Sequence, residues 1–86
     1  MEITEILKAL AVETRLRILL LLKEHPLCVN AMARRLGVTQ SAVSQHLRVL
    51  RAARLVRDHR EGAFVHYSLN EEVVDRFREE IDRLLR

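Results

Sequence analysis

Residues 27–56 of the chain read LCVNAMARRLGVTQSAVSQHLRVLRAARLV, and this stretch decides the fold. Apolar residues at helical spacing precede Gly37, and a second helical stripe formed by Val43, Leu47 and Leu50 follows it. Gly37 suits the left-handed residue that ends a helix, and Thr39 can cap the next one. We therefore predict a helix over about 31–36 with Asn30 as its N-cap, a short turn, and a helix over about 40–53. Two helices joined by a short turn that contains glycine are typical of a helix-turn-helix.

Regular elements extend outward from this stretch on both sides. Helical periodicity predicts helices over 3–10 and 13–24, and the second ends at His25-Pro26 because the residue before proline avoids helical geometry. Downstream, 55–60 and 63–69 read as strands around a turn at Glu61-Gly62, and Asn70 can cap a last helix over 71–85. The predicted fold is mainly α (α+β), a single winged helix-turn-helix domain over 1–86, with five helices and a two-stranded β-hairpin wing.

Length and composition limit the class of protein. Two glycines and one proline in 86 residues favour a mostly helical chain. The longest apolar run, residues 18–22, is far shorter than the roughly 18–20 residues that span a membrane, and no basic leader precedes it. One cysteine, Cys28, cannot form an internal disulfide. We therefore expect a cytoplasmic protein with no membrane contact.

The charge is distributed unevenly along the chain. Between residues 34 and 60 there are seven arginines and one acid, Asp58, whereas the two ends of the chain are neutral or acidic. A basic middle is typical of nucleic-acid binders, although a solvated surface would also explain it.

The helix over 40–53 carries the polar residues that could read double-stranded DNA. A helix in the major groove contacts base edges through the residues near its N-terminus. Short polar side chains there predict the base-reading set Gln40, Ser41, Ser44 and Gln45. Phosphate contacts are expected from Thr39, Arg48, Arg51 and the wing residues Arg57, His59 and Arg60. An ordinary exposed helix and hairpin remain the alternative.

Much of the chain resembles the ArsR (arsenic-repressor-like) family. The resemblance rests on residues 27–50, 53–56, the wing segments 60–62 and 65–69, and the early segment 8–19. One departure is minor: the family usually has glycine where Ala53 or Arg54 stands here. The resemblance implies a homodimeric repressor that binds an inverted-repeat operator, with the first and last helices forming the dimer interface.

The apolar stripes of those two helices agree with this expectation. They offer more apolar surface than one small core should need, although both could pack inside a single chain. The predicted interface residues are Ile3, Ile6, Leu7, Leu10, Val74, Phe77, Ile81, Leu84 and Leu85.

We predict no metal and no other cofactor. Many family members release DNA on binding a metal, and one known type of site is a Cys-x-Cys at the start of the third helix, where this chain has Cys28-Val29-Asn30. A thiophilic ion prefers two or three thiolates, so Cys28 is a weak candidate, with His25 three residues away as a conceivable partner. A second type of family site uses histidine on the last helix, which has none here.

Two other classes of function are weaker explanations. A winged helix could instead bind a protein partner, but partner surfaces prefer apolar or aromatic anchors over the polar face of helix 40–53. An enzyme is not expected, since we find neither a phosphate-binding glycine loop nor a nucleophile paired with a base.

Overall fold

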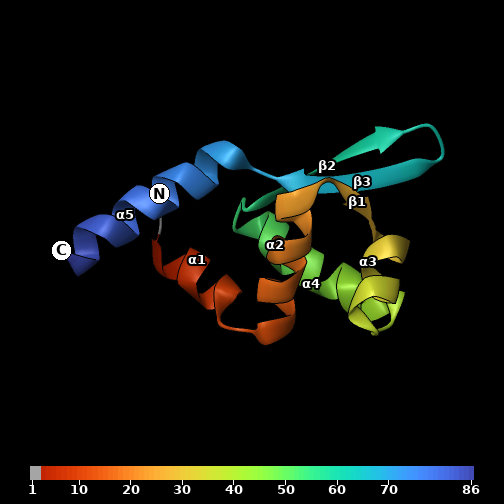
Figure 1. Cartoon of the computed structure of the whole chain (residues 1–86), viewed down its shortest axis with the longest axis horizontal. Coiled ribbons are helices and arrows are strands. Elements are labelled where there is room, and N and C mark those ends of the chain that lie inside the picture. The colour runs from red at the N-terminus through yellow and green to blue at the C-terminus, as the bar shows by residue number, and fades with distance from the viewer. Residues whose placement is uncertain (1–2) are drawn as a thin grey trace.

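The computed structural model describes residues 3–86 of the chain. Its elements are α1 (Ile3–Leu10), α2 (Glu13–Glu24), β1 (Leu27–Cys28), α3 (Val29–Leu36), α4 (Gln40–Ala52), β2 (Val56–Glu61), β3 (Phe64–Leu69) and α5 (Glu71–Leu85). The five predicted helices and the predicted hairpin are confirmed within this range. Figure 1 shows α5 at one end of the molecule, and α3 with the tip of the β2–β3 hairpin at the other. α5 therefore lies far from α3 and the hairpin tip, in a molecule whose longest dimension is 43 Å.

The sheet has a third strand that the sequence did not predict. β1 pairs antiparallel with β3 through Leu27 opposite Tyr67 and Cys28 opposite His66, which gives the order β1-β3-β2. Two residues are too few to show the alternating pattern by which strands are recognised. The two-stranded wing is thus the outer part of a three-stranded sheet, and Cys28 lies in a strand.

The start of α3 also differs from the prediction. The helix begins at Val29 rather than Ala31, and Cys28 occupies the N-cap position without a side-chain hydrogen bond. Asn30, the predicted cap, therefore lies inside the first turn. Because it caps no backbone group of α3, its side chain is available to a partner on another element.

The predicted stripe of α4 is the centre of the core. Val43, Leu47 and Leu50 are at most 2% exposed. The other fully buried large side chains come from α2, α3 and the segment before β2, and they are Ile18, Met32 and Leu55. The polar side of α4 must therefore face outward, because its apolar side is fixed against three other parts of the chain.

The segment between α4 and β2 includes a left-handed residue. Arg54 has φ 65°, a conformation that favours glycine. Leu55 then donates from its backbone N to Leu50 O at 3.0 Å and accepts from Asn70 N at 2.9 Å. The predicted strand over 55–60 consequently begins one residue later, at Val56, and the turn falls at Gly62 and Ala63 rather than at Glu61-Gly62.

The last helix begins as predicted at Glu71, with Asn70 as its N-cap. The Oδ1 atom of this N-cap accepts a hydrogen bond from Val73 N at 3.4 Å, and Glu71 and Glu72 occupy the first turn, where the helix dipole favours acids. Among residues 3–86, no helix is both long and apolar enough to cross a membrane.

Candidate nucleic-acid interface

The turn between α3 and α4 fixes where the polar helix starts. Gly37 ends α3 in the left-handed region, with φ 70°, and donates from N to Ala33 O at 2.9 Å. Thr39 is the N-cap of α4, and its Oγ1 accepts from Ala42 N at 3.0 Å. Both predicted capping residues are confirmed. The Thr39 hydroxyl keeps its own hydrogen, which it can still donate to a phosphate.

The four predicted base readers are all exposed and share one side of α4. Helical geometry places Ser41 and Gln45 opposite the buried stripe, and Gln40 and Ser44 on the flank between the two sides. Among residues 3–86, Gln40 is the reader whose side chain has a hydrogen-bond partner: its Nε2 donates to Asn30 Oδ1 at 3.1 Å. The structure thus brings the predicted readers together at the N-terminal half of one exposed helix face.

The two arginines further along α4 have different surroundings. Arg48 is exposed and, with Ser44 and Tyr67, lines a groove between α4 and the sheet. Arg51 also lines this groove, but its Nε lies 3.2 Å from Asp58 Oδ1 on β2. Arg51 therefore joins the helix to the wing, and a phosphate would have to compete with Asp58 for it.

The wing arginines lie on opposite faces of the sheet. Side chains alternate along a strand, so Asp58 and Arg60 point to the face nearer α4, and Arg57 and His59 point to the other. Arg60 is exposed, whereas Arg57 donates from a terminal guanidinium nitrogen to Asn70 Oδ1 at 3.1 Å. Arg60 is thus the wing arginine that stands nearer to the α4 side, and Arg57 supports the junction with α5.

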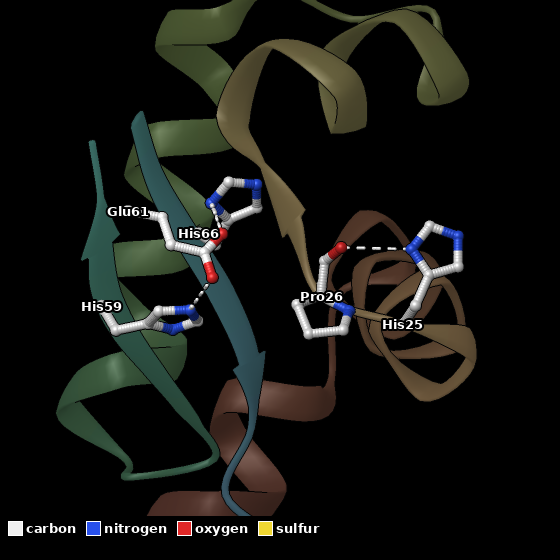
Figure 2. Close-up of polar contacts among 5 residues, drawn as sticks. All are labelled: His25, Pro26, His59, Glu61 and His66. Atoms are coloured by element: carbon white, nitrogen blue, oxygen red, sulfur yellow. Dashed lines mark hydrogen bonds and ion pairs between the residues drawn. The ribbon is translucent and has the colours of Figure 1, made fainter. Parts of the chain in front are cut away.

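The outer face of the wing holds a cluster of two histidines and an acid, shown in Figure 2. The stacked rings of His59 and His66 have centroids 5.9 Å apart. Glu61 lies between them, with Oε2 3.9 Å from His59 Nε2 and Oε1 3.6 Å from His66 Nδ1. The sequence placed Glu61 in the turn and His66 in the second strand, so it did not predict that the two lie together. The useful signal is the cross-strand register of His59 with His66.

In the part of the chain that the structure describes, no three or more His, Cys, Asp or Glu side chains form a group that could hold a metal ion. Cys28 is a free, partly buried thiol. The His25 ring lies against the backbone, with Nδ1 3.1 Å from Pro26 O, as Figure 2 also shows. The expected absence of a cofactor stays a prediction.

The predicted dimer residues divide into buried and exposed members. Ile6 is only 3% exposed and belongs to the core of the single chain, so it has no surface to offer a partner. Ile3 is partly buried, and Leu10, Val74 and Phe77 pack partly against the core. A mostly apolar groove follows this side of the molecule and is lined by Leu10, Leu19, Leu55, Val74, Phe77, Arg78 and Ile81. The remaining members, Leu7, Leu84 and Leu85, are 41%, 66% and 75% exposed.

Similar proteins are consistent with this geometry. The profile of the arsR family of bacterial regulatory proteins matches residues 12–58. The chain is 42% identical over 84 residues to a transcriptional repressor SmtB homolog of Synechocystis, covering 96% of this chain and 64% of that protein. It is 36% identical over 69 residues to the transcriptional repressor SdpR of Bacillus subtilis, covering 80% of this chain and 77% of that protein. The chain thus spans slightly less than two thirds of the first of these relatives.

A solved structure extends the likeness to three dimensions. It is a homodimeric winged helix-turn-helix DNA-binding domain from Mycobacterium bovis, described as a possible ArsR-family regulator. The two share 32% identity and a TM-score of 0.80, over 94% of this chain and 76% of that one. The fold, the matched residues and the relatives agree, and the chain belongs to the arsR family of bacterial regulatory proteins.

Proposed function

We propose that this protein is a sequence-specific transcriptional repressor that binds double-stranded DNA as a homodimer. The observation that carries the proposal is the exposed polar face of α4, where Gln40, Ser41, Ser44 and Gln45 lie together at the N-terminal half of a helix. A helix of this kind fits the major groove, and amides and hydroxyls can hydrogen-bond base edges. The cytoplasm, where DNA is available in a bacterial cell, is the expected location.

The charges around α4 support contact with the DNA backbone. Arg48 and Arg60 are exposed on the α4 side, and Thr39 lies at the N-terminus of the helix. Phosphate contacts of this kind position a protein on the duplex, while base contacts specify the sequence. Arg51, Arg57 and His59 have partners within the chain, so they are expected to contribute less than Arg48 and Arg60.

The apolar groove and the exposed end of α5 support pairing of two chains. Phe77 and Ile81 line the groove, and Leu84 continues the stripe toward the end of the helix. Pairing through α1 and α5 would leave α4 exposed at the other end of each chain. In a symmetric dimer the two α4 helices then enter successive major grooves, about 34–36 Å apart, on an inverted repeat.

The relatives favour DNA over a protein partner. The SmtB homolog and SdpR are named as transcriptional repressors, and the Mycobacterium bovis domain is described as DNA-binding and homodimeric. Repression would follow if the dimer occupies an operator. No catalytic role is proposed.

Selection of duplexes from a random pool tests the proposal. The bound duplexes should share an inverted repeat, and affinity for them should fall steeply with salt, because phosphate contacts release counterions. Gln45→Ala and Ser44→Ala should each cost about 1–3 kcal/mol on the selected duplex and little on random DNA. A protein that selects no sequence and ignores DNA at low salt would refute the proposal.

A further inference from the structure

The side chains of Asn30 and Gln40 join the beginnings of the two helices of the helix-turn-helix. Asn30 lies in the first turn of α3, and Gln40 is the first residue of α4. Gln40 Nε2 donates to Asn30 Oδ1 at 3.1 Å, and both side chains are exposed. Asn30 caps neither helix, since Cys28 and Thr39 hold the two N-cap positions. This contact therefore has no obvious role in building either helix.

The hydrogen bond sets which way the Gln40 amide points. With Asn30 Oδ1 as the acceptor, the amide nitrogen of Gln40 faces Asn30 and its carbonyl oxygen points elsewhere. An amide nitrogen carries two hydrogens, and one of them remains available after the other is bound to Asn30. Gln40 thus keeps one donor and one acceptor for a ligand, with their relative positions fixed.

One donor beside one acceptor is what the major-groove edge of adenine requires. Adenine presents an acceptor at N7 and a donor at N6, and a glutamine amide can bind both at once. Guanine presents two acceptors there, which an amide in this fixed orientation matches poorly. An untethered amide could rotate and offer its nitrogen alone, so the tether should sharpen the choice between the two purines.

The tether also acts before DNA arrives. A free glutamine loses rotamer freedom when it binds a base, and that loss weakens binding. The backbone of Gln40 is already fixed by the Thr39 cap, and Asn30 holds the end of the side chain. The Gln40 side chain is therefore held at its backbone end by the helix and at its amide end by Asn30.

We propose that Asn30 is a positioning residue that orients the Gln40 amide to select adenine at one base pair of each half-site. This inference rests on the proposed function. Asn30 itself touches no base in this account. Its effect is exerted through Gln40 alone, and the other readers of α4 act independently of it.

A double-mutant cycle on the full chain tests the inference. The base pair read by Gln40 is identified first, as the position where Gln40→Ala abolishes the preference of the wild type among the four base pairs. Affinities are then measured for Asn30→Ala, Gln40→Ala and the double variant, on the selected duplex and on duplexes changed at that position. We expect Asn30→Ala to reduce discrimination against guanine there at least threefold and to add nothing to Gln40→Ala.

Two further variants separate orientation from general effects. Asn30→Asp keeps an acceptor in the same place, so it should retain the discrimination while weakening binding to every duplex through charge repulsion. Asn30→Ala combined with Gln45→Ala should give additive losses, since Gln45 is not bonded to Asn30 in the structure. Thermal melts should show no change for Asn30→Ala, because both side chains are exposed.

Several results would overturn the inference. They are unchanged discrimination in Asn30→Ala, a loss of discrimination in Asn30→Asp equal to that in Asn30→Ala, or a Gln40→Ala protein with the wild-type preference at every position. In each case the wild-type protein still binds the selected duplex with strong salt dependence, so the proposed function stands. Absence of any sequence-selective binding by the wild type refutes the proposed function and this inference together.

Discussion

Arg15 on α2 donates from Nε to His46 Nδ1 on α4 at 3.2 Å. The same guanidinium donates from one of its terminal nitrogens to Ala9 O, near the end of α1, at 3.1 Å. One side chain therefore connects three helices. In the proposed function α1 belongs to the dimer interface and α4 reads DNA, so this connection links the element that pairs the chains to the element that reads bases.

Replacing Arg15 should destabilise the fold. Arg15→Met removes two hydrogen bonds and leaves partly buried acceptors unsatisfied, which should lower the free energy of unfolding by about 1–3 kcal/mol. Urea denaturation measures the loss. Arg17→Met, on the same helix but exposed, is the matched control and should change the free energy by less than about 0.5 kcal/mol. Equal effects of the two variants would show that the Arg15 hydrogen bonds contribute nothing.

Arg54 should be replaceable by glycine with a gain in stability. Its φ of 65° lies in the left-handed region, which costs an ordinary residue about 1–2 kcal/mol relative to a right-handed one. Glycine avoids that strain but loses more backbone entropy on folding. Arg54→Gly should therefore raise the free energy of unfolding by roughly 0.5–1 kcal/mol. Arg54→Ala keeps the strain and should give no gain, and a gain of the same size from alanine would argue against backbone strain.

Asp58 should limit the affinity of the protein for DNA. It lies 3.2 Å from Arg51 and holds this cation beside the wing. Asp58→Asn removes a negative charge and releases Arg51 for a phosphate. Binding should tighten on specific and random duplexes alike, and the slope of log affinity against log salt should steepen by up to about 0.9. In Arg51→Ala the same Asp58 substitution should leave the slope nearly unchanged, and an equal steepening in both backgrounds would exclude Arg51 as the cause.

The end of α5 should control pairing of the chains. Leu84 is 66% exposed and continues the apolar stripe of α5, so Leu84→Glu should place a charge in the proposed interface. Sedimentation equilibrium should then show mostly single chains. Leu20, on α2, is 62% exposed and lies outside the predicted interface, so Leu20→Glu is the control and should stay paired. Loss of pairing in the control, or pairing retained in Leu84→Glu, would contradict the proposed interface.

The local features of the fold could be predicted from the sequence. The turn at Gly37, the cap at Thr39 and the stripe formed by Val43, Leu47 and Leu50 each depend on residues close together in the chain. The cap of α5 at Asn70 is of the same kind. Such features follow from backbone geometry and helical spacing, which need no knowledge of distant contacts.

Features that depend on distant residues could not be predicted. β1 exists because Leu27 and Cys28 meet β3 some forty residues later, and two residues carry no periodic signal. Ile6 has the spacing of an interface residue, but its neighbours in three dimensions place it in the core. Within the candidate site, the residue types alone predicted the exposed polar face of α4. The partners Asn30 for Gln40 and Asp58 for Arg51 became visible only when the helices and strands were in place.

The proposed dimer holds its two α4 helices at a set distance, and the spacing of the two half-sites tests this most directly. Affinity would be measured for a selected duplex and for the same half-sites moved apart by about five base pairs, half a helical turn. A rigid pair of α4 helices predicts that the altered duplex binds no better than one carrying a single half-site. Equal affinity for the two spacings, with one chain bound per half-site, would contradict the account.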